Sequence, residues 1–259
     1  MNEQTCKSVN LPTVRQLHFW APFILQGVAW PFGRFALDFF TRLKISGREN
    51  LTTAIRNSKE RGVGVVFALN HTSELDILFP LVAISPLSPL FPMFYVTHGR
   101  SRYQKETAFG WRRHIYGLPA FLVSWGAHQY IAGQNDYSKA LSYHERILKM
   151  GKSVCIFPEG KIRKGASGER AHGGVGYLSE ATGAIVVPVA VSGASGMSVG
   201  DFLKRRRRLR ISYGTPLTHH DIVDTSLPIP ERYQTAAKEI MKTIDQMRAG
   251  HLRSEEVFL

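Results

Sequence analysis

Two polar side chains of complementary chemistry follow a strongly apolar segment of the sequence. Residues 65–69 read VVFAL, His71 follows two positions later, and Asp76 comes five positions after the histidine. Imidazole is largely neutral near pH 7 and can accept a proton from an alcohol. A carboxylate on its other ring nitrogen fixes the tautomer and stabilises the imidazolium that forms. We therefore predict that His71 is a general base oriented by Asp76, with the substrate supplying the hydroxyl.

The same spacing occurs a second time, between His219 and Asp224, so spacing alone does not identify a site. Context separates the two pairs, because His71 ends a strand-like run and precedes an amphipathic segment. A second polar cluster, CIFPEGKIRKG at 155–165, ends another strand-like run downstream. Ligand sites of α/β sheets collect at the carboxyl ends of the strands. We expect His71 and Glu159 to lie there.

The segments that must position these residues form an alternating series. We expect strands within 42–51, 63–69, 90–98, 120–125, 153–158, 184–193 and 208–217, and helices at 74–84, 137–150, 173–182 and 231–248. A nearly continuous apolar run such as 63–69 is typical of a strand covered on both faces. The alternation predicts an α/β fold, layered, with a mostly parallel sheet flanked by helices.

The N-terminal region has a different character. Residues 17–33 carry no formal charge, are rich in Trp and Phe, and contain Pro22 and Pro31. A bilayer crossing needs about 20 apolar residues, so we predict a kinked, membrane-embedded helical segment lying in one leaflet, with Trp20 and Trp30 near the headgroups. A buried core helix is the alternative. The predicted organisation is a membrane-associating segment at 1–43 and one α/β domain at 44–259.

Charge and cysteine content limit the partners and the compartment. The chain has 259 residues and a formal charge of +13, which predicts an anionic partner such as nucleic acid, an acidic protein or a membrane surface. The densest basic run, at 204–210, is open to three interpretations: a membrane patch, a solvated strand entry or a nucleic-acid contact. Because no nucleic-acid-binding motif accompanies it, no nucleic-acid partner is expected. Two distant cysteines and the lack of a secretory signal predict the cytoplasmic face of a membrane.

Three ordered blocks make the sequence similar to the glycerolipid acyltransferases, the family of 1-acylglycerol-3-phosphate acyltransferase. NHTSELD at 70–76 resembles the family's NHxxxxD block, FPEG at 157–160 its third block, and IVVPVAV at 185–191 its fourth. The resemblance covers about residues 44–218. It implies transfer of a fatty acyl group from acyl-CoA or acyl-carrier protein, as co-substrate and without a cofactor, to a lysophospholipid hydroxyl. The first expectation is 1-acylglycerol-3-phosphate, giving phosphatidic acid, with membrane lipids as partners.

The resemblance also assigns the FPEG block to the acceptor site. A carboxylate at Glu159 can accept hydrogen bonds from glycerol-like hydroxyls, and Gly160 lets the backbone approach closely. Lys161, Arg163 and Lys164 supply charge that can pair with a phosphate.

The sequence departs from the family pattern at two places. Lys161 and Ile162 separate FPEG from Arg163, whereas the family usually continues with Thr-Arg-Ser. The second block normally ends in arginine, but the matching stretch at 117–131 contains none. Another lysolipid or an amino-acid lipid is therefore an alternative acceptor. A non-enzymatic basic protein that binds membranes or nucleic acid is the alternative from another functional class.

Other motifs fail on spacing. GKS at 151–153 lacks the glycine of a phosphate loop, since Arg146 stands in its place, and no G-x-S-x-G segment supports a Ser-His-Asp hydrolase. The triplet at 219–221, His-His-Asp, is interpreted as a solvated turn. No metal site is expected.

Overall fold

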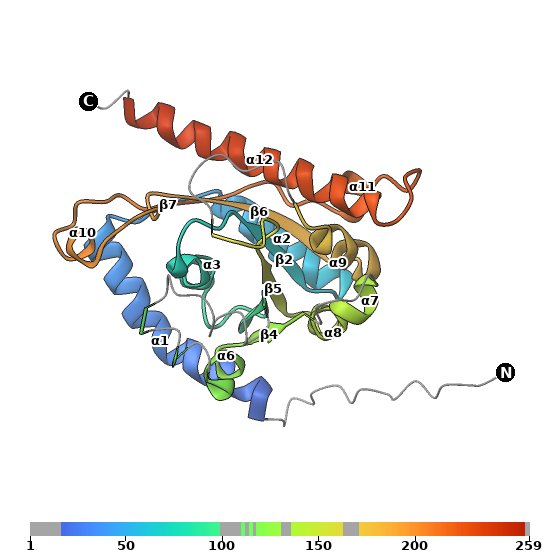
Figure 1. Cartoon of the computed structure of the whole chain (residues 1–259), viewed down its shortest axis with the longest axis horizontal. Coiled ribbons are helices and arrows are strands. Elements are labelled where there is room, and N and C mark those ends of the chain that lie inside the picture. The colour runs from blue at the N-terminus through green and yellow to red at the C-terminus, as the bar shows by residue number, and fades with distance from the viewer. Residues whose placement is uncertain are drawn as a thin grey trace.

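The computed structural model describes residues 17–98, 110–111, 114–115, 118–130, 136–162 and 171–256. Its strands form one sheet in the order β1-β7-β6-β2-β5-β3-β4 (Figure 1). They are β1 (Lys44–Ser46), β2 (Val65–Leu69), β3 (Met93–Thr97), β4 (Ala127–Gln129), β5 (Ser153–Ile156), β6 (Ile185–Ser192) and β7 (Arg210–Tyr213). Only β6 and β7 pair antiparallel among these strands, so the predicted α/β fold with a mostly parallel sheet is confirmed.

Helices cover both faces of the sheet. They are α1 (Leu17–Thr41), α2 (Arg48–Arg61), the 3-10 helix η1 (Glu74–Ile77), α3 (Phe79–Ala83), α6 (Pro119–Ser124), α7 (Tyr137–Ala140), α8 (Ser142–Lys149), α9 (Gly174–Thr182), α10 (Val199–Leu203), α11 (His219–Ile222) and α12 (Glu231–Glu256). Buried side chains of α1, α2 and α3 share one core with alternate strand residues, and those of α8, α9 and α12 share the other.

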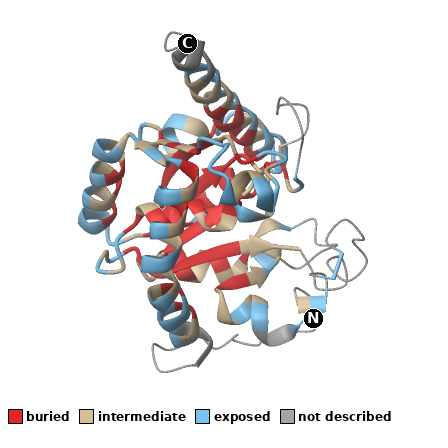
Figure 2. Ribbon diagram, turned by 90° about the vertical axis from the view of Figure 1, so that its left-hand side faces the viewer, coloured by how far each residue is buried: buried red, intermediate tan, exposed pale blue. Residues whose placement is uncertain are grey.

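The central strand β2 is buried on both sides, as its apolar run predicts. Val65, Phe67 and Leu69 pack into the core under α1, α2 and α3, whereas Val66 and Ala68 pack into the other core. None of the five is exposed to solvent, and the buried strands appear red in Figure 2. Full burial of a Val, Leu or Phe side chain contributes about 1.5–3 kcal/mol. The residues that follow β2 are therefore attached to a strand whose position is fixed by burial on both faces.

The predicted strand at 120–125 is wrong, because residues 120–124 lie in α6 and Trp125 caps its end. Pro119 occupies the first turn, where its missing N–H breaks no helical hydrogen bond. None of residues 121–125 is buried, and Phe121 and Val123 are 42% and 36% exposed. Strand β4 begins after Gly126, which has φ 84°; a Cβ there would lie 2.8 Å from the Met93 carbonyl oxygen. A short apolar run does not distinguish a helix from a strand by periodicity.

Smaller differences concern the ends of elements. The helix predicted at 74–84 is divided into η1 and α3, and the one at 137–150 into α7 and α8. The strand predicted at 208–217 is shorter in the structure: it is β7, which pairs antiparallel with β6. Helix α2 was not predicted, although Gly47 and Gly62 bound it in left-handed conformations that suit glycine.

Helix α1 is longer than the predicted segment and is attached to the domain along one side. The Gln26 amide is fully buried and bonds both the N–H and the C=O of Met93, at 2.9 and 2.7 Å. Trp30 Nε1 donates to the Ile84 carbonyl at 2.8 Å. The other side exposes apolar side chains, including Phe32 (73%) and Phe35 (68%). Among the helices that the structure describes, none is long and apolar enough to span a bilayer.

Candidate active site

Asn70 determines where the chain leaves strand β2. Its fully buried side chain donates from Nδ2 to the Val191 carbonyl at 3.0 Å, and its Oδ1 accepts from the Val191 N–H at 2.8 Å. These two bonds extend the pairing of β2 with β6 by one residue through a side chain. His71 is therefore the first residue free to turn out of the sheet, at its carboxyl edge.

The turn after His71 brings Asp76 back against the imidazole. His71 Nδ1 lies 3.0 Å from Asp76 Oδ2, and the carboxylate is fully buried. Thr72 and Ser73 each donate a backbone N–H to Oδ2 and a hydroxyl to Oδ1. Ser73 also caps η1 by accepting from the Leu75 N–H. The five-residue spacing thus becomes a closed loop around one carboxylate.

The hydrogen bond to Asp76 assigns the tautomer of His71. A carboxylate oxygen accepts, so Nδ1 carries the hydrogen and Nε2 keeps its lone pair. The ring stacks on Phe157 with centroids 4.2 Å apart, which holds its plane. The side chain is 19% exposed. An alcohol that reaches Nε2 would therefore meet an oriented proton acceptor.

The FPEG block lies beside this pair, at the end of the neighbouring strand β5. Glu159 is 5% exposed, and its Oε2 accepts from the His71 backbone N–H at 3.2 Å. Gly160 has φ 65°, and a Cβ at this position would lie 2.8 Å from the ring of His172. The structure therefore brings His71, Asp76, Glu159 and Gly160 together, as the sequence predicts.

Two polar side chains that the sequence analysis missed continue this row. His98 Nε2 lies 2.6 Å from the Gly160 carbonyl oxygen, and His98 Nδ1 lies 3.0 Å from the Tyr130 hydroxyl. His98 directly follows β3 and Tyr130 directly follows β4. For His98 the sequence offers the rule already applied to His71, a polar residue at the end of a predicted strand. For Tyr130 it offers no such signal, because β4 is not among the predicted strands.

Of the three basic residues predicted to bind the phosphate, one lies in the part of the chain that the structure describes. Lys161 is exposed at the end of the FPEG turn, and Arg163 and Lys164 lie outside the described residues. The second pair of equal spacing does not form the same arrangement: Asp224 accepts from the N–H and hydroxyl of Ser226. Within the described chain, no hydrogen bond joins His219 to Asp224.

Cys155 lies under the active pair but is not available as a nucleophile. Its side chain is fully buried in β5, and burial together with the nearby Asp76 charge raises the pKa of the thiol well above its usual value. A neutral, inaccessible thiol does not attack a thioester. The arrangement fits direct attack by a substrate hydroxyl. In the part of the chain that the structure describes, no three His, Cys, Asp or Glu side chains are placed to hold a metal ion.

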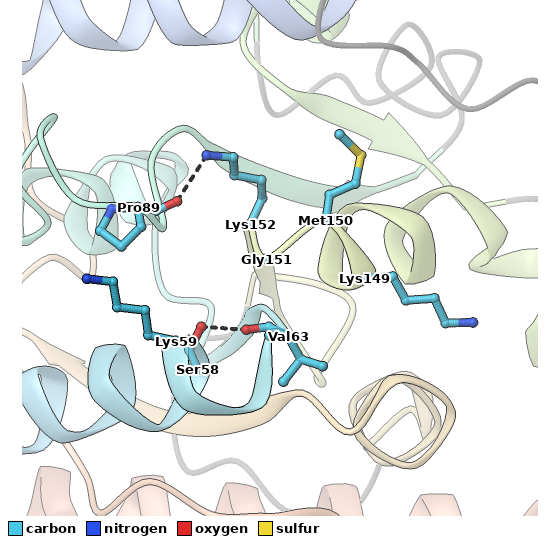
Figure 3. Close-up of a pocket in the computed structure, with 9 residues that line it drawn as sticks. Ser58, Lys59, Val63, Pro89, Lys149, Met150, Gly151 and Lys152 are labelled. Carbon is cyan, nitrogen blue, oxygen red and sulfur yellow. Dashed lines mark hydrogen bonds between the residues drawn. The ribbon is translucent and has the colours of Figure 1, made fainter.

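A separate pocket of about 380 Å³ lies at the amino ends of β2 and β5 (Figure 3). It is lined by Lys59, Lys149 and Lys152 together with short loop segments. Lys59 and Lys149 stand in the last turns of α2 and α8, where cations are stabilised by the helix dipole. Lys152 Nζ donates to the carbonyls of Pro89 and Phe91, and burial lowers its pKa. Helix ends and loop carbonyls account for these charges.

Comparisons with known proteins agree with the motifs. A family model described as Acyltransferase matches residues 42–192, more than half of the chain, including the whole row from His71 to Gly160. The fold is also similar to the crystal structure of the 1-acyl-sn-glycerophosphate (LPA) acyltransferase PlsC from Thermotoga maritima. That match has a TM-score of 0.53 and 17% sequence identity, and covers 87% of this chain and 80% of that chain. The resemblance found in the sequence is thus confirmed: the chain belongs to the acyltransferase family and is an acyltransferase.

Proposed function

We propose that this acyltransferase moves a fatty acyl group from a thioester donor to the free hydroxyl of a lysophospholipid. The observation that carries the proposal is the 3.0 Å contact between His71 Nδ1 and the buried Asp76 carboxylate, beside Glu159. His71 Nε2 takes the hydroxyl proton as the alcohol oxygen attacks the thioester carbonyl. The tetrahedral intermediate then collapses, the C–S bond breaks, and the imidazolium returns its proton to the departing thiolate.

The first choice of acceptor is 1-acylglycerol-3-phosphate, with phosphatidic acid as product. Glu159, at the active pair, can orient the glycerol hydroxyl, and Gly160 allows close approach of the backbone. Lys161, with Arg163 and Lys164 further along the chain, supplies charge for the phosphate. The donor is acyl-CoA or acyl-carrier protein, used as a co-substrate. The chemistry assigned to His71 requires no bound cofactor.

A thiol-release assay tests the proposal. Purified protein in detergent or vesicles is given an acyl-CoA or acyl-carrier-protein donor and a panel of lysolipids, and free thiol and acylated lipid are both measured. Thiol release that depends on a lysolipid, with matching lipid product, is the expected result. Release without any acceptor would indicate a thioesterase. No release with any donor and acceptor would contradict the proposal.

The exposed side of α1 supports a membrane location for this reaction. Ile24, Val28, Phe32 and Phe35 are each more than half exposed along this side. Monomeric soluble proteins rarely expose a contiguous apolar surface of this kind. We infer that α1 lies in one leaflet with this side in the acyl region, on the cytoplasmic face of the membrane.

Basic residues lie at the end of α1. Arg205 stands 4.6 Å from the ring centroid of Phe39, and the rings of Phe40 and Phe202 are 4.9 Å apart. Helix α10 and the run at 204–208 are therefore held beside the C-terminal end of α1, as Figure 1 also shows. This charge complements an anionic leaflet, where each basic residue contributes about 1 kcal/mol. Helix α1 also packs against α3, which follows the active-site turn, so a leaflet that holds α1 is close to the segment that carries Asp76.

The double substitution Phe32→Ser and Phe35→Ser should release the protein from membranes. Two exposed Phe side chains that insert into lipid contribute about 3 kcal/mol or more together, so vesicle binding should fall at least roughly a hundredfold in a co-sedimentation assay. These positions are preferable to deletion of α1, because the deletion removes Gln26 and its bonds to β3. Ile229→Ser, at an exposed position just before α12, is the matched control and should bind normally. Undiminished binding of the double variant at low and high salt would reject the insertion of α1.

A further inference from the structure

We propose that the Tyr130 hydroxyl contacts the polar end of the acceptor lipid and that His98 positions this hydroxyl. The inference deepens the proposed function and rests on it for the identity of the ligand. Tyr130 is thus assigned as a specificity-determining contact and His98 as a positioning residue.

The order of strands in the sheet aligns Tyr130 with the proposed base. From β2 outward the neighbours are β5, β3 and β4. Their carboxyl ends are followed by His71, by Glu159 and Gly160, by His98 and by Tyr130, in that order across the sheet edge. The Tyr130 N–H donates to the Thr97 carbonyl at 3.1 Å, which extends the pairing of β3 with β4 and keeps Tyr130 beside His98. One continuous row of polar groups therefore begins at the proposed base.

The hydrogen bonds of His98 leave the Tyr130 hydroxyl able to bond a ligand. The Gly160 carbonyl only accepts, so at 2.6 Å His98 Nε2 must carry a hydrogen. In the neutral imidazole, Nδ1 then accepts the Tyr130 hydroxyl hydrogen, and the phenolic oxygen can still accept from a hydroxyl of the ligand. In the imidazolium, Nδ1 donates to the phenolic oxygen, and the hydroxyl hydrogen can be donated to a phosphate oxygen. Either arrangement leaves Tyr130 one bond to offer.

The surroundings of Tyr130 place its hydroxyl near the proposed acceptor site. Its side chain is partly exposed, and His98 is the hydrogen-bond partner that its hydroxyl has among the described residues. His98 links Tyr130 to Gly160, the last residue of the FPEG block, and the exposed Lys161 follows Gly160. Tyr130 also belongs to the 117–131 stretch that lacks the arginine of the family pattern. A neutral hydroxyl paired with an imidazole would then do part of the work of that missing charge.

The test separates binding of the acceptor from the chemical step. Tyr130→Phe should raise the acceptor KM by about tenfold, the effect of losing one hydrogen bond to a polar or charged group, with donor KM and kcat nearly unchanged. Tyr143→Phe is the matched control: its ring packs against His128 of β4, and its buried hydroxyl has no hydrogen-bond partner among the residues that the structure describes. That variant should have the KM values of the wild type.

A double-mutant cycle tests the role of His98. His98→Phe keeps a ring but removes the hydrogen bonds to Tyr130 and Gly160, so it should raise the acceptor KM and, through Gly160, also lower kcat. If His98 acts on the acceptor through Tyr130, adding Tyr130→Phe to that variant should raise the KM by less than twofold more. Full multiplication of the two effects would overturn the positioning role.

The acceptor panel identifies the lipid group that Tyr130 contacts, and a binding measurement tests the contact without turnover. A larger effect of Tyr130→Phe on 1-acylglycerol-3-phosphate than on monoacylglycerol assigns the contact to a phosphate oxygen, whereas equal effects assign it to a glycerol hydroxyl. Calorimetric titration with a short-chain, water-soluble lysophosphatidic acid measures binding without turnover. Weaker binding by Tyr130→Phe supports the inference even if no transfer is found, an outcome that would reject the proposed function alone. Normal transfer with unchanged KM and unchanged binding would overturn the inference and leave the function standing.

Discussion

Replacing His71 with alanine should lower acyl transfer by about 10²–10⁴-fold, the usual contribution of a general base. The expected loss follows from the geometry around Nε2: Asp76 holds the proton on Nδ1, and Phe157 fixes the ring plane. Removal of the imidazole leaves the attacking hydroxyl without an acceptor for its proton. The thiol-release assay measures the loss.

The second pair of equal spacing supplies the control for this experiment. His219→Ala and Asp224→Ala should retain nearly full activity, since Asp224 bonds to Ser226 and the pair lies in a different part of the chain. Circular dichroism and vesicle binding of His71→Ala should match those of the wild type, because its partly exposed ring is not part of either core. An active His71→Ala variant, or inactive variants at 219 and 224, would contradict the assignment.

The sequence predicts the central part of the fold well because burial there is unambiguous. The run at 65–69 has apolar residues at every position, a pattern typical of a strand covered on both faces, and the helices on the two sides of β2 supply that cover. The run at 120–125 has the same appearance but lies at the edge of the sheet, where one side is open and Pro119 can begin a helix. Coverage by other elements decided between the two structures, and no local pattern contains that information.

The same distinction applies to the active site. His71 and Asp76 are five residues apart, so one turn suffices to join them, and Glu159 follows from the shared edge of parallel strands. His98 and Tyr130 are 62 and 30 residues from Gly160 in the sequence. His98 contacts Gly160, and Tyr130 contacts His98, because β3 and β4 follow β5 in the sheet. Strand order arises from the packing of the whole domain. Residues whose proximity depends on it are the part of a site that a single sequence does not show.

Substituting Asp76 with asparagine should have a different effect from the usual loss of an orienting carboxylate. In a triad, the amide commonly turns its NH2 group toward the histidine and selects the wrong tautomer. Here the N–H groups of Thr72 and Ser73 point at the same Oδ2 atom that meets His71 Nδ1. An NH2 group at that position would face two donors, whereas the hydroxyls near Oδ1 can rotate to accept from it. The amide oxygen should therefore stay toward the imidazole.

The loss in Asp76→Asn should then report the charge rather than the tautomer. With the hydrogen still on Nδ1, His71 remains a competent base, but the imidazolium formed during attack no longer faces a negative charge. Removing one preorganised electrostatic partner typically costs about 10²–10³-fold in kcat, and KM values for donor and acceptor should change little. Asp76→Ala removes both the charge and the acceptor for four donors of Thr72 and Ser73, so it should lose activity and unfold at lower temperature. The thermal melting temperature and kcat of the two variants distinguish a catalytic from a structural role of the Asp76 charge. A stable Asp76→Asn variant with kcat within a few-fold of the wild type would show that the buried charge serves folding and not catalysis.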